Sequence, residues 1–279
     1  MRDKRLTVRD IASVIEKIAP RELQETWDNS GFQIEFGDTS ADRVLTCLEL
    51  NMDILREAQA LSCSMIVTHH PLIFSGIRKI NSGDAEGDMI IELIKSGISV
   101  YSCHTPFDKA KGGNNDMLAR AIGLVSLKNL AGENVEEPEK MMERNSMFDI
   151  GRIGKFRNAV SVSEAAEMLC ENLDIDRHKI RWTGNPERTV KTVGICTGAG
   201  IEFAEAAASK GCELFITGDI KHHEAQKAED MGIAVIDAGH YGTEKSFGEN
   251  MRSLLQKHLG GKVEIFAASR STDPFEVFL

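Results

Sequence analysis

No stretch of the 279-residue chain approaches the roughly 18 consecutive apolar residues that a membrane-spanning helix needs. The opening residues, MRDKRLTVRD, also lack the apolar middle of a secretory signal peptide. These two absences predict a cytoplasmic protein with no membrane partner. The apolar fraction of 42% and the mean hydropathy of −0.22 indicate a globular fold, and the length predicts one large or two ordinary domains.

Positive charge is scarce as well. The chain has 33 basic side chains against 43 acidic ones, which gives a formal net charge of −10, and its basic residues form no stripe. A protein that follows the phosphates of a nucleic acid needs such a basic surface, so a nucleic-acid partner is disfavoured. A glycine-rich P-loop, which would hold a triphosphate, is also absent from the sequence.

Cysteine is sparse: the six cysteines are spread over the chain and none forms a CxxC pair. A disulfide framework is therefore not expected, and the sequence predicts reduced, mostly buried thiols. Histidine differs, because most of the eight histidines follow apolar runs. Those are His69, His70, His104, His222, His223 and His240, whereas His178 and His258 stand alone and are interpreted as surface residues.

The apolar periodicity alternates between strand and helix, which predicts an α/β fold. A first lobe is expected over 1–128, a charged and Met-rich exposed connection over 129–156, and a second lobe over 157–279. Near the N-terminus, Thr7 is expected to cap a helix, and Trp27 is expected to anchor the core. The other expected strands are 44–50, 65–68, 98–102, 190–196, 214–217, 234–237 and 263–267, and the other helices 53–60, 88–95, 163–173, 202–210, 222–231 and 244–259.

The two halves share a sequence pattern. Residues 47–68 align with 196–217 at a constant offset of 149 without a gap, and cysteines coincide at two positions of this alignment. At an offset of 136, His104 and Asp108 coincide with His240 and Glu244, and a longer loop in the first half accounts for the difference of 13. The pattern predicts an internal duplication of a strand-helix-strand unit.

Histidines and carboxylates follow three of the expected strands. Because ligands gather at the carboxyl ends of strands in an α/β sheet, we expect these side chains to lie together. A single histidine after a strand is more often an ordinary polar residue, but its repetition at successive strand ends favours a metal site. Imidazole and carboxylate together suit Zn, Mn, Fe or Ni, and the candidates exceed the needs of one ion. The six candidates are His69, His70, His104, Asp108, His240 and Glu244.

His222 and His223 follow Thr217-Gly218-Asp219, the counterpart of Thr68-His69-His70, and should lie near the same strand ends. Two interpretations stay open for them: a catalytic or substrate-binding role, with His223 as the candidate, or a place at the start of a helix. Asp219, the counterpart of His70, is ambiguous in the same way. Met141, Met142 and Met147 of the connection indicate a mobile or interfacial segment more than a copper site.

Five motifs carry a resemblance to a known family: ETWDNSGF, IVTHHPLIF, YSCHTPFD with GGNND after it, ITGDIKHHEA and DAGHYGTE. In this order and spacing the chain resembles the Nif-three-like family, whose members are often labelled GTP cyclohydrolase type 2 homologues. The resemblance runs from about Leu6 to Phe278, and THHP and GHYxxE are its most specific elements. Asn-Leu is usual where this chain has Pro106-Phe107, and WDNVGL is usual where it has WDNSGF; neither departure touches a proposed ligand.

The resemblance implies two similar α/β lobes, a toroidal homohexamer, and two divalent metal ions in the cleft between the lobes. Longer members carry an inserted domain, for which this chain has room only in a short form. The implied metal ligands are His69, His70, Asp108, His240 and Glu244, with Asp108 or Glu244 bridging, and His104 is implied as a ligand or near neighbour, with a catalytic role.

These observations together predict a divalent-metal-dependent hydrolase that acts on a small polar, nucleotide-like substrate. The family label suggests the opening of the guanine imidazole ring of GTP by addition of water at C8. The alternative is a non-catalytic regulatory or scaffold protein, whose metal ions hold lobes and partners together and whose metal site is closed to water.

Overall fold

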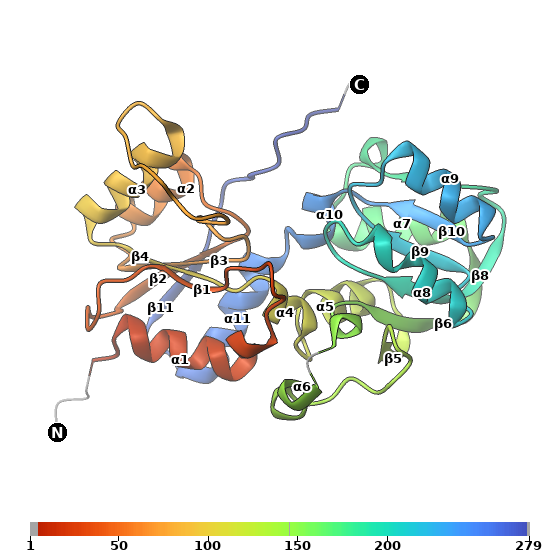
Figure 1. Ribbon diagram of the computed structural model, residues 1–279, viewed down its shortest axis with the longest axis horizontal. Helices are drawn as coiled ribbons and strands as arrows, with labels where there is room; N and C mark the ends of the chain where they lie inside the picture. The colour runs from red at the N-terminus through yellow and green to blue at the C-terminus, as the bar shows by residue number, and fades with distance from the viewer. Residues whose placement is uncertain (1–4, 145, 278–279) are drawn as a thin grey trace. The chain divides into compact units, whose positions relative to one another are not determined.

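The computed structural model describes residues 5–144 and 146–277 (Figure 1). The chain folds into two compact units, each with its own sheet. Unit 1 combines Met1–Phe107 with Ser246–Thr272, and unit 2 combines Asp108–Lys245 with Asp273–Leu279. The predicted α/β fold is confirmed, since each sheet contains parallel strands connected by helices.

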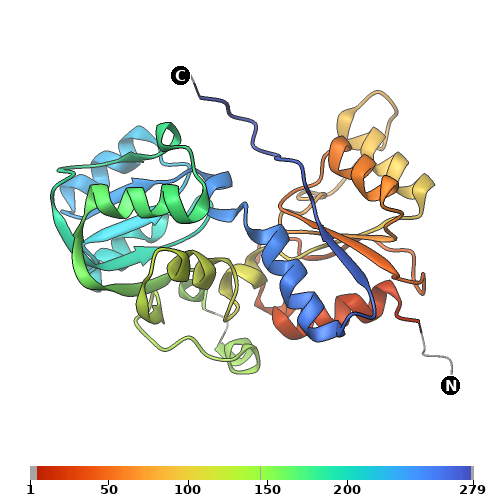
Figure 2. The ribbon, with the colours of Figure 1, turned by 180° about the vertical axis from the view of Figure 1, so that it is seen from behind.

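Unit 1 is built on a five-stranded sheet in the order β1-β4-β3-β2-β11, in which only the pairing of β1 with β4 is antiparallel. Helices α2 and α3 cover one face and α1 and α11 the other (Figures 1 and 2). The strands are β1 (Gly31–Ile34), β2 (Arg43–Cys47), β3 (Met65–Thr68), β4 (Ser99–Ser102) and β11 (Glu264–Ala267), and the helices η1 (Arg21–Leu23), α1 (Val8–Ile18), α2 (Met52–Ala60), α3 (Ala85–Ser96) and α11 (Phe247–Leu259).

Unit 2 is built on a six-stranded sheet in the order β5-β6-β8-β9-β10-β7, with β8, β9 and β10 parallel. The strands are β5 (Val125–Asn129), β6 (Arg152–Ser161), β7 (Arg181–Trp182), β8 (Thr189–Ile195), β9 (Leu214–Thr217) and β10 (Ala234–Asp237). The helices are α5 (Asn114–Ala121), α6 (Pro138–Arg144), α7 (Val162–Leu173), α8 (Ala204–Ser209), α9 (His222–Asp230), α10 (His240–Glu244), η2 (Met147–Asp149), η3 (Arg177–Lys179) and η4 (Ile201–Phe203); α4 (Thr105–Lys109) crosses the unit boundary.

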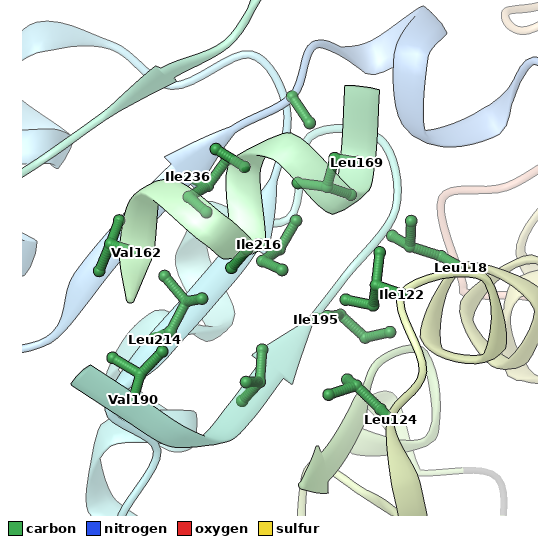
Figure 3. Close-up of a cluster of buried hydrophobic side chains, with 14 of the residues drawn as sticks. Leu118, Ile122, Leu124, Val162, Leu169, Val190, Ile195, Leu214, Ile216 and Ile236 are labelled. Carbon is green, nitrogen blue, oxygen red and sulfur yellow. The ribbon is translucent and has the colours of Figure 1, made fainter. Parts of the chain in front are cut away.

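The core of unit 2 follows the two-residue alternation of its strands. Leu214 and Ile216 face α7 and contribute to the cluster drawn in Figure 3, whereas Phe215 between them packs on the opposite face with residues of α8 and α9. Both faces of β9 are therefore buried, as expected for a central parallel strand covered by helices on both sides.

The division into units differs from the lobes expected from the sequence. The C-terminal helix α11 and strand β11, expected in the second lobe, belong to unit 1, because β11 pairs in parallel with β2. The hydroxyl of Thr46 donates to the carbonyl of Gly248 at 2.7 Å, which ties α11 to the same strand. Residues 108–156 belong to unit 2.

The expected exposed connection over 129–156 is also replaced by folded structure, since it contains α6 and the start of β6. Arg152 is fully buried, and its guanidinium donates to Asp116 at 2.5 Å and to the carbonyl oxygens of Lys109 and Asp149. A buried arginine is tolerated only with such a complete set of acceptors, which a charged stretch of sequence does not reveal. Met141 is buried too.

Five of the six cysteines are buried and the sixth, Cys170, is partly exposed, which confirms the prediction that the thiols are mostly buried.

Candidate metal centre

Three histidines gather at the carboxyl ends of β3 and β4 in unit 1. The parallel register places Thr68 beside Ser102, so the residues that follow both strands lie at one edge of the sheet. The ring centroid of His69 is 5.1 Å from that of His70 and 5.0 Å from that of His104. One nitrogen of each ring lies within 4.8 Å of the others. The histidine set of unit 1 is therefore close enough to share a metal ion.

Oxygen acceptors orient two of these rings. Nδ1 of the buried His69 is 2.9 Å from the carbonyl oxygen of Cys103, and Nδ1 of His104 is 2.9 Å from Oδ1 of Asp28. A carbonyl or carboxylate oxygen can only accept, so Nδ1 carries the hydrogen in each ring. In the neutral ring Nε2 then holds the lone pair that binds metal, which is the usual arrangement of a metal-binding histidine.

Asp28 is a residue of the candidate site that the sequence did not single out. Its buried carboxylate accepts from the hydroxyls of Ser30, at 2.9 Å, and Thr105, at 2.5 Å, and pairs with His104. Burial alone would raise the pKa of Asp28, but the hydrogen bond and charge of His104 and the two hydroxyls outweigh it and lower the pKa to about 2. The WDN motif was the available signal.

In unit 2, His240 and Glu244 face each other across one turn of α10. Nε2 of His240 lies 3.1 Å from Oε2 of Glu244, and Nδ1 lies 2.8 Å from Oδ2 of Asp219. The helix begins at His240, four residues before the start of the helix expected over 244–259. The two side chains lie on one face of α10, and Asp219, which the sequence left ambiguous, pairs with His240.

The third ligand candidate of unit 2 is the buried Asp108. Its Oδ1 accepts from Nδ2 of Asn114 at 2.9 Å and lies 3.5 Å from Oγ1 of Thr197. A carboxylate oxygen of Asp108 also lies within 4.8 Å of one of Glu244, which is equally buried. Two ionised carboxylates this close repel each other in a low-dielectric site, and a divalent cation between them relieves that cost.

Gly198 allows the loop after β8 to approach the ligands closely. Its φ is +68°, and a Cβ atom there would lie 2.5 Å from Oε1 of Glu244 and 3.2 Å from Nε2 of His240. The neighbouring Cys196 is fully enclosed, and burial together with the carboxylates of Asp108 and Glu244 raises the pKa of its thiol well above the usual range. The thiol of Cys196 is therefore protonated and uncharged at neutral pH.

The donor set fits divalent metal ions. Two ligand atoms bound at about 2.1 Å to one ion stand about 3.0 to 3.4 Å apart. The 3.1 Å between His240 and Glu244 falls in that range. A mixed set of imidazole and carboxylate ligands is typical of sites for Zn, Fe, Mn or Ni, the metals considered from the sequence.

Not every residue predicted near the site joins these groups. His222 and His223 are exposed on the first turn of α9, and within residues 5–144 and 146–277 neither belongs to a cluster of close ligand atoms. His222 lines a pocket with Trp182 and Asp237 instead. The catalytic role of His223 stays a prediction.

Trp27 was expected in the core, and that prediction is wrong: the side chain is 55% exposed and contacts the rings of Phe74 and His104.

Known proteins resemble this chain over nearly its whole length. The sequence profile of the Duf34/NIF3 (NGG1p interacting factor 3) family matches residues 6–274. The chain belongs to the Duf34/NIF3 family. It is 32% identical over 275 residues to the GTP cyclohydrolase 1 type 2 homolog of Clostridium acetobutylicum, covering 97% of this chain and 98% of that protein. It is 30% identical over 251 residues to the GTP cyclohydrolase 1 type 2 of Helicobacter pylori, covering 89% and 91%.

The fold of the Duf34/NIF3 family is found in solved structures as well. A Bacillus cereus protein related to NIF3 superimposes with a TM-score of 0.88 at 24% identity, over 99% of this chain and 100% of that one. As in the sequence, the described part of the chain has no helix long and apolar enough to pass through a bilayer.

Proposed function

We propose that the chain is a divalent-metal-dependent hydrolase that holds two ions per chain. The ligands are those of the sequence prediction, His69, His70, Asp108, His240 and Glu244, with Asp108 or Glu244 as the bridge. The observation that carries the proposal is the pairing of buried carboxylates with imidazoles oriented by acceptors at Nδ1.

We propose that the candidate ligands of both units serve one centre, as the family resemblance implies. Helix α4 starts directly after His104 and carries Asp108 one turn later, so a single short helix connects the histidine set to the carboxylate set. The removal of a ligand from either unit should therefore lower ion binding by the whole protein.

The side chains around the ligands have definite tasks. The carbonyl of Cys103 and the carboxylate of Asp28 accept the Nδ1 hydrogens of His69 and His104, so Nε2 of each ring would be the atom that binds a metal ion. Asn114 fixes the carboxylate of Asp108. Two divalent ions, when bound, lower the pKa of a bound water toward neutrality and stabilise charge on the attacked group.

The substrate we propose is small, polar and nucleotide-like. The names of the relatives point to a guanine nucleotide, whose imidazole ring would be opened by water at C8. Since the sequence lacks a P-loop, phosphate recognition would depend on the metal ions.

The test is a screen of phosphoesters, nucleotides and cyclic amidines with protein reconstituted with Zn, Mn, Fe or Ni in turn. We expect turnover with at least one metal, abolished in His69→Ala and retained in His258→Ala, which changes an exposed histidine of α11. Two tightly bound ions with no turnover under any condition would favour the alternative, a regulatory or scaffold protein.

We also propose a cytoplasmic homo-oligomer, in the form of the toroidal hexamer that the resemblance implies. Light scattering at micromolar concentration should give a multiple of the 30.7 kDa chain mass, and the mass of one chain would contradict the proposal.

A further inference from the structure

Two large aromatic side chains of unit 1 are exposed beside the histidine set. Trp27 is 55% exposed and Phe74 is 53% exposed, although side chains of this size bury most of their surface in folded proteins. Their ring centroids lie 6.1 Å apart and the ring planes are tilted by 39°. Because the rings are not stacked in parallel, each keeps ring surface available to another molecule.

Polar side chains tie together the two segments that carry these rings. Nδ2 of Asn29, two residues after Trp27, donates to the carbonyl of Ile73 at 2.6 Å. The amide of Ile73 donates to Oε1 of Gln33 at 3.0 Å. Both bonds fix the residue directly before Phe74, so the aromatic pair is positioned without being packed into the core. A surface arranged in advance loses little conformational entropy on binding.

Both rings contact His104 edge-on. The ring centroid of His104 lies 5.9 Å from Trp27, with planes at 74°, and 6.4 Å from Phe74, with planes at 76°. His104 is itself 5.0 Å from His69. A molecule that lies on the aromatic pair is therefore next to the histidine set of unit 1.

We propose that Trp27 and Phe74 form a stacking surface for a planar heterocyclic ring of the substrate. This inference rests on the proposed function, because the ring belongs to the molecule that the metal centre hydrolyses. Aromatic side chains stack on the face of any nucleobase, because every base has a flat π-face. In a chain with a net charge of −10 and no P-loop, such a surface supplies recognition that basic residues do not.

The chain contains only two tryptophans, which makes a direct binding test possible. Trp182→Phe leaves Trp27 as the sole indole. We expect GMP, AMP or UMP to quench its fluorescence after correction for absorbance, with protein loaded with Mn²⁺. Ribose 5-phosphate, which has the sugar phosphate without the ring, should not quench. In Trp27→Phe, where Trp182 is the sole indole, none of these probes should quench.

Phe74→Ala in the Trp182→Phe background should weaken nucleotide binding about tenfold, the usual effect of removing one stacking partner. Ile80→Ala is the matched control, because Ile80 is another large apolar side chain, 47% exposed, in the same connection between β3 and α3. It should leave the dissociation constant unchanged. Thermal melting of each variant separates lost binding from lost folding.

The failures of the two proposals are distinguishable. Quenching of Trp27 by nucleotides in a protein that hydrolyses nothing keeps the stacking surface and removes the hydrolase. If no nucleotide quenches Trp27, or if ribose 5-phosphate quenches it equally, the stacking surface is overturned, whatever the hydrolytic activity. An equal loss of affinity in Phe74→Ala and Ile80→Ala overturns it as well.

Discussion

The two units show the same succession of elements over much of their length. Unit 1 runs α1-β1-β2-α2-β3-α3-β4-α4, and unit 2 runs α7-β7-β8-α8-β9-α9-β10-α10. Within the sheets, β1-β4-β3-β2 corresponds to β7-β10-β9-β8, with the first strand of each set antiparallel to its neighbour. The next strand differs, since β11 is parallel to β2 whereas β6 is antiparallel to β8.

The division into units separates two kinds of candidate ligand, because the boundary falls inside α4, between His104 and Asp108. Unit 1 offers imidazole rings, and unit 2 offers two buried carboxylates with one histidine. Two buried carboxylates repel each other, so a bound cation would lower the free energy of unit 2 most.

The internal duplication stays a prediction, although the topology is compatible with it. Cys47 ends β2 and Cys196 directly follows β8, the corresponding strand. Superposition of residues 44–108 on 193–244 would test the equivalence further.

The largest effect is expected from the carboxylates. Glu244→Gln keeps the shape of the side chain but removes its charge, so the protein should lose at least one ion per chain and any hydrolytic activity while staying folded. Elemental analysis and thermal melting check this. Glu249→Gln, on the exposed side of α11, is the control and should keep both ions. Full occupancy in Glu244→Gln would remove that residue from the site.

The next effect concerns the stability of unit 2. Arg152→Ala leaves the buried Asp116 without its 2.5 Å partner, and the free energy of unfolding should fall by about 3 to 5 kcal/mol. Arg157→Ala, exposed on the same strand, should change it little. Urea denaturation measures both, and equal values for the two variants would contradict the role assigned to Arg152.

A smaller effect separates backbone strain from ligand geometry. Gly198→Ala and Gly211→Ala both place an L-residue at positive φ, at +68° and +79°, which costs about 1 to 2 kcal/mol. Only the Cβ at 198 meets Glu244; the one at 211 has nothing within 4 Å. We expect both variants to melt earlier but only Gly198→Ala to bind fewer ions in a metal titration. Equal metal affinity in the two would refute the close approach.

The smallest expected effect is found by comparing α1 with α7, the helices that begin the two successions of elements. Thr7 starts α1 and Ser161 starts α7 with the same reciprocal capping box, so replacement of either by Ala should cost about 1 kcal/mol. Hydrogen bonds from the backbone amide of Ser161, and then from its hydroxyl, lower the pKa of Glu164 from its usual 4.5. That stabilisation exists above the unfolded pKa and is lost as the pH falls through the folded one. Alanine removes only the hydroxyl, so the cost of Ser161→Ala should shrink in acid by the contribution of the hydroxyl alone. Denaturation at pH 7 and pH 3 measures it, and a pH-independent cost would contradict this account.

Local signals predicted the parallel strands well. The expected bounds 65–68, 214–217 and 234–237 coincide with β3, β9 and β10. Apolar runs of four residues between turns are too short for a typical helix and are typical of buried strands. The six ligand candidates came from histidines and carboxylates at the ends of such strands, and the proposed set of five came from the family resemblance. The prediction that Trp27 is buried in the core failed, because the residue type and the adjacent sequence do not distinguish an exposed tryptophan from a buried one.

Long-range pairing could not be predicted. No local pattern shows that β11 returns to β2, or that Arg152 is satisfied by carbonyls from residues some forty positions away. Asp28 and Asp219 orient His104 and His240, two of the candidate ligands, through contacts of the same kind, at sequence separations of 76 and 21 residues. Such contacts depend on the tertiary fold, and the sequence next to each residue does not predict them.

The return of α11 and β11 to unit 1 also sets an order for biosynthesis. While the ribosome is still producing unit 2, β2 has no partner on one side, because the strand that covers it is encoded near the C-terminus. Unit 2 is almost continuous in sequence and can complete its sheet first, whereas the earlier-made half of unit 1 waits with an open strand edge. During synthesis the open edge of β2 is therefore the strand edge most prone to pair with another chain. A fragment that stops at residue 245 would lack β11 and would keep this edge open permanently.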